Sequence, residues 1–151
     1  MRVPMRRSLT LIGLLFVLLS GLVHAGKARA AAVSARATKV VKIALKERGI
    51  RYRYGGSSPR GGFDCSGFTR WVYAHVGVSL PHSSYAQFNV GRRVSLRSLR
   101  PGDLLFFDGV GHVGIYIGHG RFVHAPHTGA VVQVTPLAQY GGSIDGARRL
   151  Y

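Results

Sequence analysis

The only cysteine of this 151-residue chain lies in a glycine-framed segment, and this segment constrains the fold more than any other. Two glycines precede residues 63–67 (FDCSG), and apolar side chains then recur at helical spacing up to residue 76. A helix that begins at Cys65 places the thiol near unpaired backbone N–H groups and the positive end of the helix dipole, and both favour the thiolate. Because the thiolate is the nucleophilic form, the pattern predicts a reactive Cys65 at a helix N-terminus.

Two histidines farther along the chain are candidates to assist this cysteine. His112 begins the apolar segment 112–118, and His124 ends the segment 121–124. A cysteine, then a histidine that accepts its proton, then a polar residue that orients the histidine is the order a thiol hydrolase needs. Taken singly, Cys65 is also compatible with a small buried side chain and His112 with an ordinary strand histidine. Their combination with the helix start favours catalysis.

The spacing of the two histidines predicts that they meet. Antiparallel pairing about a turn near residue 119 places position 112 opposite roughly position 126, so a small stagger brings His112 and His124 together. We therefore predict that His124 orients His112 as the third member of the site. The alternative is a strand histidine bonded only to backbone. His119 and His127 are rival orienting residues that flank turns, where rotamers are held less firmly.

The N-terminus has the features of an export signal. Three arginines within the first seven residues are followed by the apolar segment 9–23 and by small residues that predict cleavage after Ala25 or, as a second site, after Ala30. An uncleaved membrane anchor is the alternative, but the apolar run is about fifteen residues against the roughly twenty that span a bilayer. No cysteine follows the apolar run directly. We therefore expect a signal peptide over residues 1–25 and an exported protein, periplasmic or secreted, that is not a lipoprotein.

The remainder of the chain is predicted to form one domain preceded by a short flexible lead. Residues 26–37 are rich in alanine and of low complexity, and we expect a flexible lead there. Residues 38–151 suffice for one hydrophobic core and are too few for two. A single cysteine cannot form an internal disulfide, which leaves its thiol as a candidate reactive group.

The charge is strongly basic, with a formal net charge of +16 over the whole chain. Residues 38–151 alone keep 15 basic and 5 acidic residues, a formal charge of +10. Such a surface attracts polyanions. The export signal and the lack of a recognition-helix pattern argue against nucleic acid, and anionic envelope polymers fit better. A solvated basic surface of no specific use is the alternative.

The hydrophobic patterns predict an α+β fold in which helices come first and an antiparallel sheet of about five to six strands follows. We expect helices at residues 38–48, 65–76 and 83–89, and strands at residues 50–54, 103–108, 112–117, 121–124, 131–135 and 147–151. The segment at 104–107 is too apolar to alternate, so we expect a central strand covered on both faces.

Several short blocks, taken in order, resemble the NlpC/P60 family of bacterial cell-wall cysteine peptidases. The blocks are YRYGG at 52–56, FDCSG at 63–67, LPHSSYAQ at 80–87, PGDLLFF at 101–107, HVGIYIG at 112–118 and GARR at 146–149. The resemblance covers residues 38–151. It implies a papain-like core with the cysteine helix packed on the sheet, and it implies that Cys65 and His112 are catalytic and that His124 completes the triad.

The resemblance also implies roles around the nucleophile. Tyr52 lies near the cysteine in similar enzymes and completes the oxyanion donors together with the Cys65 N–H, although a core aromatic is the alternative. Asp64 and Ser66 line the pocket for a free amino end of the substrate. From the sequence alone, Asp64 is equally a helix N-cap and Ser66 a first-turn residue. A carboxylate beside the nucleophile also disfavours the thiolate.

The activity that the resemblance implies is hydrolysis of peptidoglycan stem peptides through an acyl-enzyme, between D-glutamate and the diamino acid. A peptidoglycan amidase of the same superfamily and a non-catalytic wall-binding protein are the alternatives. We expect a monomer without a cofactor. We also expect no metal, because the remaining histidines, His75 and His82 among them, have no metal-box spacing.

Overall fold

The computed structural model describes residues 9–151, with side chains from residue 24 onward. The predicted signal peptide therefore lies partly outside the described residues. The chain divides into two compact units, residues 1–35 and 36–151. Helix α1 covers Leu9–Lys46, so residues 26–37, expected as a flexible lead, are helical. Their alanine content accounts for this, since alanine has the highest helix propensity. In the described part of the chain, no helix is long and apolar enough to cross a membrane.

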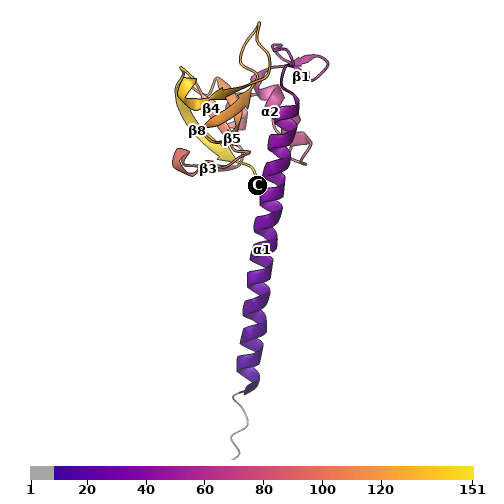
Figure 1. Ribbon diagram of the computed structural model, residues 1–151, viewed down its shortest axis with the longest axis vertical. Helices are drawn as coiled ribbons and strands as arrows, with labels where there is room; N and C mark the ends of the chain where they lie inside the picture. Colours follow the sequence, from indigo (N-terminus) through magenta and orange to yellow (C-terminus); the bar gives the residue numbers. More distant parts are fainter. Residues whose placement is uncertain (1–8) are drawn as a thin grey trace, which may run out of the picture. The chain divides into compact units, whose positions relative to one another are not determined.

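The second unit is built on an antiparallel sheet with the strand order β3-β8-β4-β5-β6-β7 (Figure 1). The strands are β3 (Arg92–Val94), β4 (Leu104–Phe107), β5 (His112–Gly118), β6 (Arg121–His124), β7 (Gln133–Pro136) and β8 (Ile144–Arg149). A separate hairpin pairs β1 (Ser57–Ser58) with β2 (Gly62–Phe63). The α+β prediction is confirmed.

Two short α-helices precede the sheet in the chain. They are α2 (Cys65–Ala74) and α3 (Ser84–Gln87), and the single 3-10 turns η1 (Leu96–Ser98) and η2 (Leu137–Gln139) complete the elements. The expected strand at 50–54 is reduced to isolated bridges, Arg51 to Val131 and Tyr52 to Phe63. The sequence did not predict β3, because two of its three residues are exposed arginines that give no apolar alternation.

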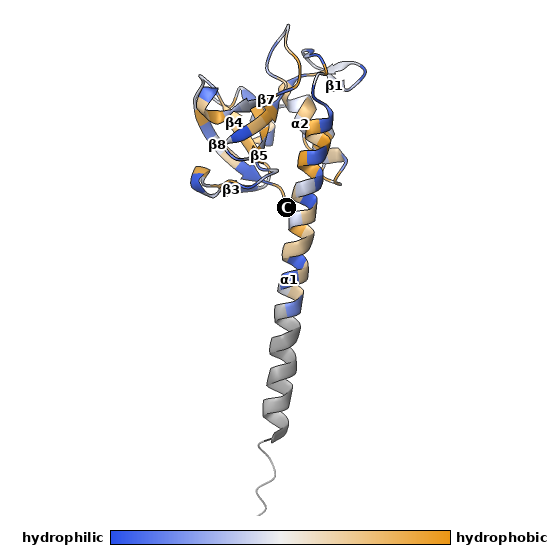
Figure 2. Cartoon of the chain, in the orientation of Figure 1, coloured by the Kyte–Doolittle hydropathy of each residue, from blue (hydrophilic) through white to orange (hydrophobic). Residues whose placement is uncertain are grey.

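Strand β4 is covered on both faces, as its apolar run predicts. Leu104 and Phe106 join the core that α2 and the end of α1 complete with Phe68, Val72 and Val40. Leu105 and Phe107 face a second, smaller core with Val94, Phe122 and Ala147. Figure 2 shows hydrophobic residues gathered in the central strands and on α2. The centre of the sheet is therefore packed on both faces. The functional site lies at the ends of β5 and β6 next to this centre.

A buried ion pair fixes β8 to the start of β4. The Arg149 guanidinium donates through Nε and Nη2 to the two carboxylate oxygens of Asp103, both at 2.6 Å. Nη2 also donates to the Ser98 carbonyl at 3.0 Å, and the Arg100 N–H donates to Asp103 at 2.8 Å. Such a bidentate pair, with the remaining carboxylate capacity satisfied, offsets the desolvation of two buried charges.

Candidate active site

Cys65 is the first residue of α2, as the glycine-framed segment predicts. The preceding residue, Asp64, has extended backbone angles and caps the helix by accepting from the Gly67 N–H at 2.7 Å. A Cβ at position 67 would lie 2.0 Å from the Gly56 carbonyl oxygen, which only glycine avoids. The close approach of the Gly56 backbone to the first turn of α2 therefore requires glycine at position 67.

The environment of Cys65 raises the pKa of its thiol, mainly through burial and to a smaller degree through the Asp64 carboxylate. The backbone N–H groups of Val113, Ser66 and Cys65 itself lower the pKa. The amides at the helix start favour the thiolate, as expected, but burial outweighs them, so the net shift of the thiol pKa is upward. The Val113 amide also places the thiol against β5, next to His112. A proton acceptor there is what the thiol needs to react at neutral pH.

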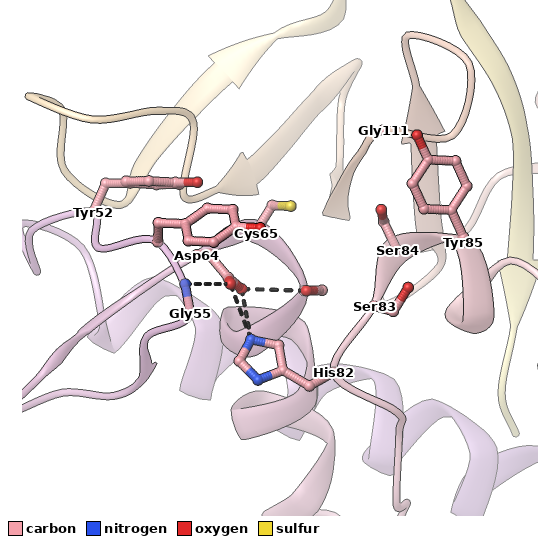
Figure 3. Close-up of a pocket in the computed structure, with 11 residues that line it drawn as sticks. Tyr52, Gly55, Asp64, Cys65, His82, Ser83, Ser84, Tyr85 and Gly111 are labelled. Atoms are coloured by element: carbon pink, nitrogen blue, oxygen red, sulfur yellow. Dashed lines mark hydrogen bonds and ion pairs between the residues drawn. The ribbon is translucent and has the colours of Figure 1, made fainter.

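The Asp64 carboxylate accepts hydrogen bonds from four groups. Besides the Gly67 amide, the Gly55 N–H donates at 2.9 Å and the Ser66 hydroxyl at 3.2 Å (Figure 3). His82 Nε2 lies 2.9 and 3.0 Å from the two carboxylate oxygens. Asp64 thus combines the predicted N-cap with a second function, which is to tie the loop at residue 55 and the wall at residue 82 to the helix start.

His82 is a site residue that sequence reasoning undervalued. It lies in the block at 80–87 that resembles the family, and this was the available signal. Its ring approaches the first turn of α2 because residue 67 has no side chain; a Cβ there would lie 2.9 Å from His82 Nε2. Figure 3 shows the His82 ring beneath Asp64, while the Cys65 thiol points toward the side of Gly111 and Tyr85.

His112 and His124 meet as the spacing predicts. They lie at the start of β5 and the end of β6, and their rings are joined by a contact of 2.7 Å between His112 Nε2 and His124 Nδ1. Both side chains are buried. Gly114 leaves room for this contact, since a Cβ there would lie 3.1 Å from that of His124 and 2.7 Å from the Phe122 ring.

Thr135 of β7 extends the pair to a third strand. Its Oγ1 lies 3.0 Å from His124 Nε2. If His124 Nε2–H donates to Thr135, His124 Nδ1 is free to accept from His112 Nε2–H, and His112 Nδ1 then keeps a lone pair. That lone pair is what a base for the thiol requires. No sequence signal marks Thr135, because threonine is common in strands and its partner is eleven residues away.

Burial keeps both histidines neutral. Desolvation lowers the pKa of His112 to about 4, although the Asp108 carboxylate opposes this. It lowers the pKa of His124 to about 3, and the neighbouring His112 adds to the effect. Two adjacent buried imidazoles hold a second proton only at high cost, since like charges repel in a dry environment. The pair is therefore suited to take up one proton, that of the thiol.

Tyr140, which follows η2, covers the histidine pair. Its ring is nearly parallel to His112, at 14° with centroids 6.2 Å apart, and packs at 4.5 Å on Phe107. The Tyr140 hydroxyl donates to Asp108 at 2.6 Å, and the Ser143 N–H donates to the same carboxylate at 3.2 Å. Sequence reasoning missed this cover, because it depends on a loop that returns across the sheet.

The cysteine lies in a cleft of about 470 Å³. Of the residues predicted from the resemblance, Tyr52, Asp64 and Ser66 all line it with Cys65. The other lining residues are Tyr54, Gly55, His82, Ser83, Ser84, Tyr85 and Gly111. Burial, followed by the charges of Cys65 and Asp64, raises the pKa of Tyr52, so its hydroxyl remains a donor at neutral pH.

Neither rival orienting residue hydrogen-bonds the histidine pair among the residues described, although the charge of His127 contributes to lowering the pKa of both His112 and His124. His119 occupies the exposed turn between β5 and β6, with a φ of 52°. His127 is exposed and its Nδ1 contacts the Thr128 carbonyl at 3.0 Å. Over the residues described, no cluster of three or more His, Cys, Asp or Glu is arranged to hold a metal ion.

Comparison with known proteins identifies the family. The NlpC/P60 family matches residues 49–143. A probable endopeptidase of Mycobacterium tuberculosis is 45% identical over 112 residues, covering 74% of this chain and 29% of the relative. The probable endopeptidase p60 of Listeria innocua is 44% identical over 114 residues, covering 74% of this chain and 24% of the relative. The chain thus spans less than a third of the length of these curated relatives.

Solved structures give the same result. The NlpC/p60 domain of the peptidoglycan hydrolase SagA superposes with a TM-score of 0.69 at 36% identity, covering 76% of this chain and 98% of that domain. The peptidoglycan hydrolase RipB of Mycobacterium tuberculosis superposes with a TM-score of 0.71 at 32% identity, covering 80% of this chain and 67% of that one.

Proposed function

The chain belongs to the NlpC/P60 family, and on that premise we propose that it is an exported cysteine peptidase that cleaves peptidoglycan stem peptides. The observation that carries the proposal is the contact of His112 with His124, which in turn contacts Thr135. His112 begins β5, and the amide of the next residue, Val113, approaches the Cys65 thiol. A histidine oriented in this way is arranged to accept a proton from the thiol. The naming of relatives as endopeptidases and peptidoglycan hydrolases supports the substrate class.

The reaction begins with attack of Cys65 Sγ on the carbonyl carbon of the scissile bond. His112 takes the thiol proton, and the imidazolium keeps its Nε2–H bond to His124. The tetrahedral intermediate collapses as His112 donates that proton to the leaving amine, which gives an acyl-enzyme on Cys65. Water, deprotonated by His112, then attacks the thioester, and the carboxylic acid product leaves as the thiol regains its proton.

Negative charge on the carbonyl oxygen is stabilised at the start of α2. The Cys65 N–H lies at the helix N-terminus, where backbone donors and the helix dipole favour an anion. The Tyr52 hydroxyl lines the same cleft, and its raised pKa keeps it protonated. We assign it as the second donor.

Asp64 and Ser66 form the subsite for the free amino end of the stem peptide in this proposal. Both line the cleft, and the Ser66 hydroxyl donates to the Asp64 carboxylate. His82 holds that carboxylate from the far side. An ammonium group that approaches from the cleft therefore meets a carboxylate whose orientation is already fixed, which reduces the entropy lost on binding.

The bond assigned is the one between D-glutamate and the diamino acid. Mass spectrometry of muropeptides digested with the purified protein tests it, with Cys65→Ala as the control for contaminating hydrolases. Fragments with a new N-terminal diamino acid support the endopeptidase. Release of the lactyl-muramic acid group instead would identify an amidase, and binding without any cleavage would identify a wall-binding protein.

The export proposal rests on the N-terminal sequence. Cleavage after Ala25 or Ala30 would leave a mature chain that begins at Gly26 or Ala31, in the periplasm or outside the cell. N-terminal sequencing of the protein from its source tests this. A product that keeps Met1 and stays with the membrane would show an anchor in place of a signal. The proposed mature protein is a monomer that reaches the wall partly through its basic surface.

A further inference from the structure

Four exposed arginines lie within nine residues, on the edge strand β3 and on the segment that follows it. We call Arg92, Arg93, Arg97 and Arg100 the edge arginine cluster. They belong to β3, to η1 and to the residue before Pro101, and β3 is the outermost strand on its side of the sheet. No Asp or Glu occurs between Asp64 and Asp103 in the sequence. The cluster therefore has no acidic residue of its own segment to neutralise it.

The guanidinium groups of this cluster form no hydrogen bond or ion pair among the residues that the structure describes, although the charge of Arg100 acts to lower the pKa of Tyr151. The fold also adds a further arginine beside them. Register pairs Arg93 with Arg148 across β3 and β8. The Arg148 guanidinium lies 4.0 Å from the centroid of the Phe88 ring and donates through Nε to the Phe88 carbonyl at 2.6 Å. The positive charge of Arg93 contributes to lowering the pKa of Arg148. Like charges directly opposite each other destabilise a strand pair.

Arg149 on the same strand shows the contrast. It is 4% exposed and fully paired with Asp103, whereas its register partner Arg92 is exposed. The fold thus neutralises the arginine that it buries and leaves the edge arginine cluster for solvent or for a ligand.

Protection of a sheet edge does not account for the whole cluster. Charged residues on an edge strand do prevent edge-to-edge pairing. Arg97 and Arg100, however, lie beyond β3, where no strand edge needs protection. All twelve basic residues after Lys46 are arginines. The guanidinium is planar and binds phosphate through two parallel hydrogen bonds, which a lysine ammonium cannot do.

We propose that the edge arginine cluster is a docking surface for a phosphodiester polymer of the cell envelope. The proposal rests on the proposed function in one respect, since export is what brings the chain to such a polymer. A polymer with a phosphate at every repeat engages several of these arginines at once. Each exposed contact alone is weak, but contacts made along one chain reinforce one another through effective concentration.

The test is a binding titration with synthetic poly(glycerol phosphate), using the full chain at several salt concentrations. The test variant replaces the four cluster arginines by glutamine. A matched variant replaces Arg48, Arg60, Arg70 and Arg121, which are also exposed, so that both lower the formal charge by four. Cooperative melting of each variant verifies the fold.

We expect the cluster variant to bind the polymer at least about tenfold more weakly than the wild type. The slope of its log Kd against log salt concentration should be smaller by about three to four. The matched variant should lose much less of both. Equal losses in the two variants would overturn the proposal, because net charge alone would then explain binding. Equally tight binding of polyglutamate or of double-stranded DNA through the same arginines would overturn the choice of partner.

Cleavage of a small soluble muropeptide separates this proposal from the proposed function. The cluster variant should keep the wild-type kcat, since none of its four positions lines the cleft. Polymer binding through the cluster without muropeptide cleavage would uphold the docking surface and refute the peptidase. Cleavage by a protein that does not bind the polymer would uphold the peptidase and refute the docking surface.

Discussion

On the cysteine side of the cleft, Asp64 is bonded to Gly55, Ser66 and Gly67, all within nine residues of it, and only His82 comes from farther away. On the histidine side, His112, His124 and Thr135 come from three strands. Local backbone geometry therefore organises the proposed nucleophile, whereas the register of the sheet organises the proposed base.

The two sides also differ in burial. The Asp64 side chain is 13% exposed and that of His82 is 25% exposed, whereas His112 and His124 are both buried. Desolvation accordingly lowers the pKa values of His112 and His124 far below the ordinary histidine value. We therefore assign substrate binding and orientation to the cysteine side, and the uptake of one proton to the histidine side.

Loss of the base has the largest expected effect. His112→Ala should abolish turnover, and His124→Ala should lower kcat by roughly 10³-fold or more, because an unoriented base rarely has the right tautomer and rotamer. His124→Gln or His124→Asn should recover part of it. Steady-state kinetics on a defined muropeptide measures this. A severe loss in His119→Ala or His127→Ala, with near-normal kcat in His124→Ala, would show that the orienting residue is wrongly assigned.

The third strand should matter less. Thr135→Val keeps the shape of the side chain and removes the acceptor for His124, so kcat should fall by roughly tenfold, the value of about one hydrogen bond. Thr135→Ser keeps the hydroxyl and serves as the matched control. If valine and serine behave alike, the hydroxyl has no part in orienting the pair.

Acid should destabilise the fold through the histidine side. The folded pKa values of His112 and His124, about 4 and about 3, lie below the ordinary value of 6.5. Between these limits the unfolded chain binds more protons, so stability is complete above pH 6.5 and falls as the pH falls toward 3. His124→Gln should make the decrease in Tm between pH 7 and pH 4 smaller by about 5 °C. The exposed control His119→Gln should not, and equal slopes in both would contradict the assigned burial effect.

Loss of His82 should give the smallest change and should affect binding more than chemistry. His82→Ala removes a donor from both oxygens of Asp64, so KM for a stem peptide with a free amino end should rise by up to about tenfold. The kcat should change little. A peptide with an acetylated amino end is the control, and an equal rise in its KM would show that His82 does not act through the amino-end subsite.

The same contrast explains what the sequence could predict. Three features could be predicted because each depends on a short-range pattern or on one tight turn. They are the helix start at Cys65, the apolar strand β4 and the His112–His124 spacing. Thr135 depends on the register of β7, Tyr140 on the loop after η2, and the Asp64–His82 contact on the segment between α2 and α3, and no periodicity records any of these. The sign of the thiol pKa shift also required the structure, because burial of Cys65 is a tertiary property.

The most direct test of the catalytic pair is the pH dependence of Cys65 alkylation by iodoacetamide. Burial raises the pKa of this thiol, so its reactivity at neutral pH has to come from proton transfer to His112. We expect wild-type Cys65 to react faster than a free thiol at pH 7. In His112→Ala the rate at pH 7 should fall by about tenfold or more and recover only at alkaline pH. Identical pH–rate profiles with and without His112 would contradict the account.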